Sequence, residues 1–229
     1  MFVSDLKGEF LSLLAGKRVI IIANIDIDSI VASKILQNLF RNENIMFSVA
    51  PVLGVKGMQR VFTDNKDDCN FYLFINCGGC VDLVELLEPD EKVILYVCDS
   101  HRPLDLCNIY SDNQVRILGD PRTEEDIPQF EQIFRDEEDE EEDSDDGIDE
   151  GQDSDDNMEG ETRKTTHIER FERRLKRNRE KRDWEKTRDR VLFNYTQNSY
   201  YARSSALIFF ELAWQTSKDT LDLLCLNIE

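Results

Sequence analysis

Hydrophobic and polar positions form two distinct patterns in the first part of the chain. Residues 19–23 are an unbroken run of apolar, mostly β-branched residues, as expected of a strand covered on both faces in a parallel sheet. Polar residues interrupt the run at 24–29, and from Ile30 the apolar positions recur at helical spacing. The pattern therefore predicts a strand, a polar turn and a helix between residues 18 and 40.

The same alternation continues to residue 118. Further strands are predicted at 45–53, 71–77, 92–98 and 114–118, and short helices at 4–16, 55–62 and 81–87. Strands that alternate with short helices are typical of a doubly wound, mostly parallel α/β sheet. We expect about five strands in this sheet, with an acidic insert and a long basic helix after it.

The pattern changes character after residue 118. Between residues 136 and 159, 16 of 24 residues are Asp or Glu, and none is Lys or Arg. Such a segment has too few apolar side chains to offset its ordering entropy, so we predict disorder. Residues 163–190 carry 13 Lys or Arg and 6 Asp or Glu, with few apolar residues, which favours a long solvated helix.

Apolar density returns near the end of the chain. Ser204 precedes a near-continuous hydrophobic segment, which predicts a helix packed into the core, and 221–228 predicts one more short helix. We therefore divide the chain into four parts. They are a sheet domain at 1–120, an acidic linker at 121–162, a basic helix at 163–190, and C-terminal helices at 191–229 that pack back on the sheet domain.

Charge and composition exclude some classes of function. The formal net charge of −20 argues against nucleic-acid binding over the whole surface, so any DNA contact is expected to be local. The chain has no apolar run of about 18 residues and no signal-peptide pattern at its start, which predicts a soluble protein that is not secreted. The cysteines lie mostly in apolar, strand-like runs, which favours buried thiols over disulfides. They are Cys69, Cys77, Cys80, Cys98, Cys107 and Cys225.

Polar side chains follow three of the predicted strands. Asp26 and Asp28 come after the first, Asn76 ends the third, and the run Asp99-Ser100-His101 follows the fourth. In an open α/β sheet these strand ends meet at the edge where ligands bind. The two aspartates alone are ambiguous, because they could ligate a hard cation or could serve the following helix, with Asp28 or Ser29 as its N-cap.

Together these strand ends resemble the DHH phosphoesterase superfamily, which includes the RecJ-type exonucleases. Its motifs are an Asp-x-Asp after strand one, an aspartate before a glycine turn, and an Asp-His-His triplet. This chain has Asn76 in place of the second-motif aspartate and Ser100 in place of the middle histidine. A phosphoesterase with two cations needs several anionic or imidazole ligands, so the resemblance implies a degenerate site at Asp26, Asp28, Asn76, Asp99, Ser100 and His101.

Four further segments resemble a narrower family, the cell division control protein 45 family. They are MFVSDL at 1–6, CDSHRP at 98–103, IFRDEE at 133–138 and FELAW at 210–214. The resemblance extends over residues 1–224 and includes the acidic insert and the basic helix in the same order. Members of this family continue far beyond this chain's end, so the chain is expected to be truncated or variant.

That family implies a replication initiation factor without catalysis. The resemblance implies a nuclear scaffold with neither nuclease nor ATPase activity, no catalytic residue, no cofactor and no membrane contact. Its implied partners are the MCM helicase subunits and the GINS complex, with single-stranded DNA at the fork and replication polymerase or loading factors. The alternative is a manganese-dependent phosphoesterase acting on single-stranded DNA or nucleotides.

The retained carboxylates raise a physical question of their own. Two carboxylates about 5 Å apart repel by roughly 3 kcal/mol at an effective dielectric of 20, so Asp26, Asp28 and Asp99 need relief. His101 or Arg102 could supply it as an ion pair, or one weakly held cation could. We favour the ion pair and expect no tightly bound divalent ion, because Asn76 and Ser100 reduce the ligand set. The residues thus predict no metal here.

A rival site uses the cysteines. Cys77 and Cys80, followed by Cys98 and His101, match the spacing of a zinc site and would predict a zinc-centred interaction module. Because Cys77 and Cys98 end apolar strands, we favour buried thiols.

The charged blocks are open to several interpretations. The basic run could be a nuclear address, a surface for acidic partners or a solvated helix face. Its residues are Arg173, Arg174, Lys176, Arg177, Arg179, Lys181 and Arg182. The acidic tract could bind a partner or act only as a linker, and Ser144 and Ser154 within it are candidate sites for an acid-directed kinase.

Overall fold

The computed structural model describes residues 1–111, 114–120, 127–135 and 160–220; side chains in the last range are described at 171, 172 and from 174 onward. The chain forms two compact units, residues 1–125 with 198–229, and residues 126–197. The predictions on residues 136–159 and 221–229, including both candidate phosphoserines and Cys225, lie outside the described residues.

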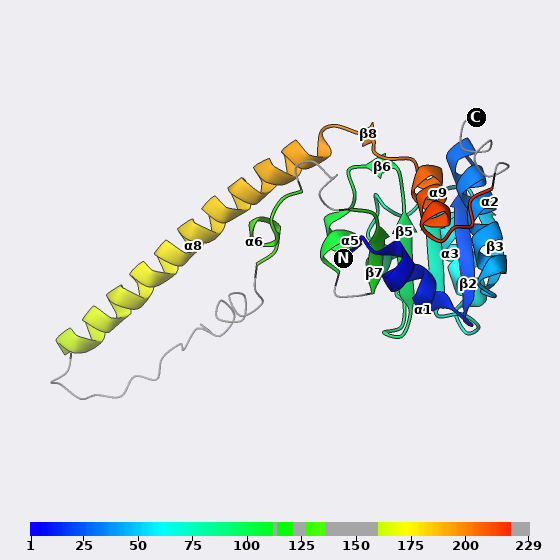
Figure 1. Cartoon of the computed structure of the whole chain (residues 1–229). Helices are drawn as coiled ribbons and strands as arrows, with labels where there is room; N and C mark the ends of the chain where they lie inside the picture. Colours follow the sequence, from blue (N-terminus) through cyan, green and yellow to red (C-terminus); the bar gives the residue numbers. More distant parts are fainter. Residues whose placement is uncertain (112–113, 121–126, 136–159, 221–229) are drawn as a thin grey trace. The chain divides into compact units, whose positions relative to one another are not determined.

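The first unit is built on a six-stranded sheet in the order β1–β7–β5–β4–β2–β3 (Figure 1). All five pairings in this sheet are parallel. The strands are β1 (Phe2–Val3), β2 (Arg18–Asn24), β3 (Met46–Val52), β4 (Phe71–Ile75), β5 (Ile94–Cys98) and β7 (Val115–Leu118). The predicted fold class, a doubly wound and mostly parallel α/β sheet, is confirmed.

One strand escaped the prediction. β1 has only two residues, and it pairs in parallel with Ile117 and Leu118 at the edge of the sheet. Two residues carry no periodic signal, so a strand held mainly by a partner more than 100 positions away cannot be found from local pattern. The sheet therefore has six strands where about five were expected.

Helices cover both faces of the sheet. On one face lie α2 (Ile27–Asn42), α9 (Ser205–Gln215), the π-helical turn η1 (Leu6–Leu11) and α1 (Ser12–Leu14). Phe10 is central there, with its ring centroid 5.0 Å from that of Tyr96 and 6.3 Å from those of Phe40 and Phe209. The other helices described in this unit are α3 (Gly54–Asn65), α4 (Leu83–Leu87) and α5 (Leu106–Tyr110). On the opposite face, the ring centroid of Phe62 of α3 lies 4.8 Å from that of Tyr72 of β4.

Two details of the predicted helices are wrong. α2 begins at Ile27, three residues early, and its N-cap is Asp26 and neither Asp28 nor Ser29. Ile30 is 53% exposed and so is not on the buried face of α2. The spacing of the first helix predicts Leu13 on one apolar face with Leu6, Phe10 and Leu14. Leu13 is instead 42% exposed, because the wider π-helical turn shifts the angular position of the residues that follow it.

A second, two-stranded sheet lies beside the carboxyl end of β5. β6 (His101–Arg102) pairs antiparallel with β8 (Tyr200–Tyr201), and the Ala202 N–H donates to the Ser100 carbonyl at 2.8 Å. The sequence analysis did not anticipate this pairing. It fixes the segment before α9 next to the third polar strand end.

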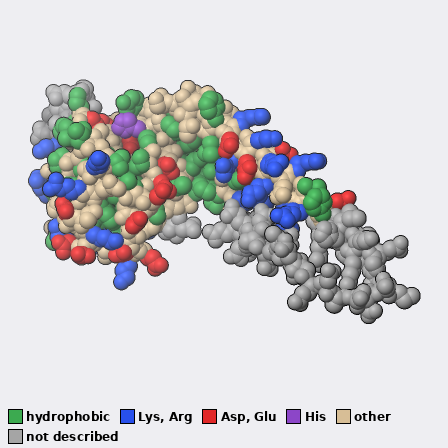
Figure 2. All heavy atoms as spheres, turned by 180° about the vertical axis from the view of Figure 1, so that it is seen from behind, with side chains coloured by type: hydrophobic (Ala, Val, Ile, Leu, Met, Phe, Trp, Pro, Cys, Tyr) green, Lys and Arg blue, Asp and Glu red, His purple; other side chains and the backbone are tan. Residues whose placement is uncertain are grey.

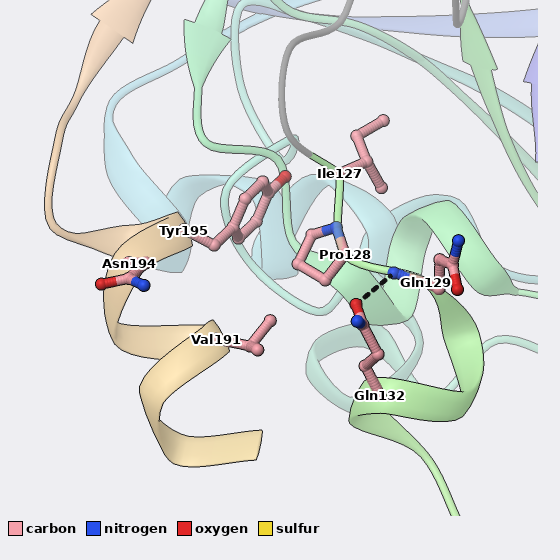
Figure 3. A pocket seen from close by; sticks show the side chains of 7 residues that line it. All are labelled: Ile127, Pro128, Gln129, Gln132, Val191, Asn194 and Tyr195. Carbon is pink, nitrogen blue, oxygen red and sulfur yellow. Dashed lines mark hydrogen bonds between the residues drawn. The ribbon is translucent and has the colours of Figure 1, made fainter. Parts of the chain in front are cut away.

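The second unit contains the predicted basic helix. α8 (Gly160–Thr196) has 37 residues and extends beyond the predicted 163–190 at both ends. It packs against α6 (Phe130–Ile133), and the Trp184 indole donates to the Glu131 carbonyl at 3.4 Å. Within this unit a pocket of about 490 Å³ is lined by Val191, Asn194 and Tyr195 of α8 and by residues 127–129 and 132 (Figure 3). Among the described residues, no helix is long and apolar enough for a membrane crossing.

Candidate functional site

The polar strand ends meet around one cavity of about 670 Å³ at the carboxyl edge of the main sheet. Its lining includes five of the six positions of the predicted degenerate site, namely Asp26, Asp28, Asn76, Ser100 and His101. Asp99 lies directly beside it and is only 6% exposed. The sequence therefore predicted correctly which loops come together.

Asp26 is the N-cap of α2. Its carboxylate accepts from the Ser29 N–H at 2.7 Å, from the Ser29 hydroxyl at 2.9 Å and from the Asn24 amide at 2.9 Å. A side chain in this position satisfies a backbone donor that the helix itself leaves unpaired. Asp26 thus has a structural role at the start of α2.

Asp28 caps a different helix. It accepts from the Ser204 hydroxyl at 2.5 Å and from the N–H groups of Ser205 and Ala206, both at 2.9 Å, at the start of α9. The Asn76 amide donates a fourth hydrogen bond at 2.7 Å. Burial by itself raises the pKa of Asp28, but these four hydrogen bonds outweigh it and hold the pKa below its ordinary value of 3.8.

Asn76 joins the parts of the site. Its amide nitrogen donates to Asp26 at 3.2 Å and to Asp28 at 2.7 Å, so it lies between the two carboxylates. Its oxygen accepts from the Ser100 N–H at 3.0 Å and from the Ser205 hydroxyl at 2.7 Å. The backbone φ of 50° is in the left-handed region, which Asn tolerates better than most residues. An aspartate here would lose both donors.

Asp99 is held by its neighbours. One oxygen accepts from the His101 N–H at 2.9 Å and lies 2.7 Å from the His101 ring nitrogen, and the other accepts from the Gly79 N–H at 3.0 Å. A Cβ on Gly79 would approach the Asp99 side chain to 2.8 Å, so only glycine permits this contact. The Arg102 guanidinium donates to the carbonyls of Asp99 and His101 at 2.7 and 2.8 Å.

The residues present do not fit a pair of catalytic cations. The space between Asp26 and Asp28 holds the donating amide of Asn76, where a cation would require an oxygen. All four hydrogen bonds to Asp28 occupy the lone pairs that would otherwise ligate an ion. Among the described residues, the Asp, His and Cys side chains of this cavity form no group of three whose ligand atoms lie within 4.8 Å of one another.

Sequence comparison identifies the family. The family model CDC45 matches residues 19–228. The human protein Cell division control protein 45 homolog (Homo sapiens) is 40% identical over 224 residues, which is 98% of this chain. This chain belongs to the CDC45 family.

Structural comparison agrees with this assignment at the level of the fold. The crystal structure of CDC45 from Entamoeba histolytica covers 99% of this chain with a TM-score of 0.60 and 16% sequence identity. The manganese-bound structure of RecJ from Thermus thermophilus covers 52% of it with a TM-score of 0.36 and 22% identity. The chain spans 38% of the length of the human CDC45-family protein and 32% of the Entamoeba chain.

In this CDC45-family chain, charge relief follows a different route from the predicted one. His101 does contact Asp99, as expected, but the described partners of Asp26 and Asp28 are uncharged amides, hydroxyls and backbone N–H groups. The predicted ion-pair relief is therefore wrong for these two carboxylates. Neutral donors stabilise a carboxylate without a second buried charge, whose desolvation is costly. Of the two alternatives left open for these aspartates, the capping of the following helix is found, but at Asp26, whereas Asp28 accepts its backbone hydrogen bonds from the start of α9.

Four further side chains complete the site and were not among its predicted positions. These are Asn24, Ser29, Ser204 and Ser205. Ser204 had a usable signal, since a serine before an apolar run predicts an N-cap, and it is the N-cap of α9. Nothing local to residue 204 or 205 indicates a partner 176 residues earlier in the chain.

The rival zinc site does not form. Among the described residues, the only group of three ligand-type side chains within 4.8 Å is Asp82, Asp105 and Cys107, not the predicted set of cysteines with His101. Cys98 is fully buried, whereas Cys80 is exposed. Burial raises the pKa of the Cys77 and Cys98 thiols to about 12, so both remain protonated at neutral pH. The buried-thiol interpretation holds for Cys69 and Cys98.

The hydrogen bonds to Asp28 predict a pH-dependent stability. A carboxyl group whose pKa is lowered on folding stabilises the fold fully above its unfolded pKa, and this contribution is lost as the pH falls through the lowered value. We expect the free energy of unfolding of the wild-type chain to exceed that of Asp28→Asn by a constant amount near neutral pH. The difference should shrink below about pH 4. Urea titrations of both chains across this range measure it, and a difference that stays unchanged in acid would contradict the role assigned to Asp28.

Proposed function

We propose that this chain is part of a DNA replication initiation factor that acts without catalysis. In this proposal it is a scaffold subunit of the replicative helicase, in the nucleus, with the MCM hexamer and the GINS complex as partners. Membership of the CDC45 family supports the replication role. The observation that carries the non-catalytic part is the Asn76 amide, which donates to both Asp26 and Asp28.

The ligands that the cavity offers to cations decide between catalysis and a structural role. Hydrolysis of a phosphodiester by two metal ions needs carboxylates with free lone pairs and a bound water that the ions can ionise. Here the strand ends converge as a hydrolase would require, but their oxygens accept hydrogen bonds from the start of α2 and the start of α9. The carboxylate oxygens that would ligate cations in a hydrolase therefore stabilise the fold of this chain.

Single-stranded DNA and replication polymerase or loading factors belong to the proposal as further partners. With a net charge of −20, a contact with DNA phosphates has to use a local basic surface. The Lys and Arg residues of α8 suit the proposed nuclear address at residues 173–182.

The alternative function is a manganese-dependent phosphoesterase acting on single-stranded DNA or nucleotides. What favours it is the retention of Asp26, Asp28, Asp99 and His101 around a cavity large enough for a nucleotide. Asn76 and Ser100 oppose it, because neither offers an anionic or imidazole ligand.

A hydrolysis assay separates the two functions. We expect no hydrolysis of single-stranded DNA by this chain in the presence of manganese above the level of an Asp26→Ala control. Asp26→Ala is the informative control because it removes one retained acid while leaving Asn76 and Asp99 in place. Hydrolysis that is present in the wild-type chain and absent in Asp26→Ala would establish the enzyme.

A binding assay tests the scaffold role. The full chain is expected to capture purified MCM and GINS subunits, and Asp26→Asn should bind them equally well, because asparagine can also cap α2 and the proposed contacts do not depend on this carboxylate. Capture of neither complex would refute the proposed partners without bearing on the family assignment.

A further inference from the structure

Four basic residues of α8 lie in one exposed row. Arg179, Arg182, Lys186 and Arg190 are spaced by three, four and four residues, so they share a face of the helix, and all four are exposed. Leu175 and Phe193 lie on the same face at its two ends and are 53% and 65% exposed. We call these six residues the basic stripe; it spans about 27 Å of helix.

The other face of α8 is already used within its own unit. Trp184 donates to the Glu131 carbonyl, and Val191 and Tyr195 line the pocket next to residues 127–129 (Figure 3). Arg188 places its guanidinium 5.2 Å from the Trp184 ring on that side. α8 therefore has a packed face and, about half a turn away, an exposed face that the described residues of its own unit do not cover.

The charges of the basic stripe are poorly compensated by the residues that the structure describes. In the part of the chain that the structure describes, Arg179, Arg182 and Arg190 take part in no ion pair. Lys186 lies 3.7 Å from Asp183, but both side chains are well exposed, and such pairs contribute little. Figure 2 shows Lys and Arg side chains along this helix. Like charges spaced at three and four residues repel one another and destabilise a lone helix. Binding of an acidic partner would reduce this repulsion.

We propose that the basic stripe docks an acidic amphipathic α-helix of a partner protein. The partner helix carries Asp or Glu at three- and four-residue spacing in its centre and large apolar side chains at both ends, opposite Leu175 and Phe193. A helix matches the stripe because exposed positions at this spacing along a straight helix complement the same spacing on another helix. The proposal does not depend on the replication role.

Two features favour a protein helix over nucleic acid. Acidic residues border the stripe, with Glu172 and Asp189 at its edges and Asp183 beside Lys186. A partner helix can place neutral or basic side chains opposite these acids, whereas a phosphate backbone is negative throughout and would be repelled by them. The exposed apolar residues at both ends suit the anchor positions of a helix in a groove or against a face. Binding of a phosphate backbone would not use these two apolar residues, and the acidic residues would weaken it.

The test uses a synthetic probe. It is a fluorescent, Ala-rich helical peptide of about 28 residues, about 42 Å long, with Glu at the facing positions of the two central heptads and Leu at those of the outer two. Its binding to the full chain is measured by fluorescence anisotropy at several salt concentrations. The same peptide with Gln in place of Glu, and an oligothymidine of similar length, serve as comparison ligands.

Two double variants with equal charge change are compared. Arg179→Gln/Arg182→Gln removes two charges from the basic stripe, and Arg174→Gln/Lys176→Gln removes two exposed charges of the same helix outside it. We expect the first to raise the dissociation constant about tenfold and the second less than about twofold, with affinity falling as salt rises. Phe193→Gln is expected to weaken binding several-fold at all salt concentrations.

Several results would overturn the proposal. One is an equal loss in both double variants, which would show that binding follows net charge and not the stripe. Another is oligothymidine binding as tightly as the peptide with the same dependence on Arg179 and Arg182, which would make the stripe a nucleic-acid surface. Absence of saturable peptide binding, or self-association of the chain through Phe193, would equally exclude an acidic helix as the occupant.

Discussion

Replacing Asp28 with alanine is expected to lower the free energy of unfolding of this chain by about 4 kcal/mol. Four hydrogen bonds are lost together, two of them from backbone N–H groups at the start of α9. Truncation leaves these buried or half-buried donors without an acceptor, which costs more than an ordinary hydrogen bond contributes. The largest effect should appear in α9, because Asp28 is what fixes its N-terminus to the loop after β2.

An ordinary helix cap provides the matched control. Asp82 is the N-cap of α4 and accepts from the N–H groups of Val84 and Glu85, both in its own helix. Its only described side-chain partner from another element is the Cys107 thiol, which is a weak donor. Asp82→Ala should therefore cost about 1 kcal/mol, the usual range for a local cap. Chemical denaturation compares the two variants, and hydrogen exchange reports protection in α9. If Asp28→Ala costs no more than Asp82→Ala, then Asp28 is not the link between distant parts of the fold.

The elements predicted correctly are those with local signals. The apolar run of β2 and the apolar segment of α9 identify themselves, because burial on both faces or deep in the core requires consecutive hydrophobic residues. β1, β6 and β8 have two residues each, and each exists only because a distant strand supplies its hydrogen bonds. Short sequences of this kind contain too little pattern to predict, whatever rule is applied.

The site shows the same division. The convergence of Asp26, Asn76 and Ser100 follows from the strand ends of a parallel sheet, so the sequence sufficed. The arrival of Ser204 and Ser205 at Asp28 depends on how the chain returns after the second unit, which spacing along the sequence does not encode. The zinc-like spacing of the cysteines carried little weight for a related reason, since spacing along the chain says nothing about the direction in which each side chain points.

The second large effect is expected at Asn76. Asn76→Asp should lower the free energy of unfolding at neutral pH by about 3–5 kcal/mol in the absence of divalent ions. The new carboxylate oxygen would replace an amide nitrogen that lies 3.2 Å from Asp26 and 2.7 Å from Asp28, turning two hydrogen bonds into two repulsive contacts. Asn76 is 3% exposed, so water does little to screen them. The stability should recover in acid, where one of the three carboxylates takes up a proton.

Asn44→Asp separates this electrostatic effect from backbone effects. Asn44 has a φ of 56°, close to the 50° of Asn76, and the described structure gives its side chain no carboxylate partner. Asn44→Asp makes the same chemical change in the same backbone region and should lower the free energy of unfolding by less than about 1 kcal/mol.

Manganese adds a second criterion for Asn76→Asp, because three converging carboxylates favour a hard cation where two carboxylates and an amide do not. Manganese should raise the denaturation midpoint of Asn76→Asp and leave that of the wild-type chain unchanged. If Asn76→Asp is as stable as the wild type without metal, the amide is not what allows Asp26 and Asp28 to lie together.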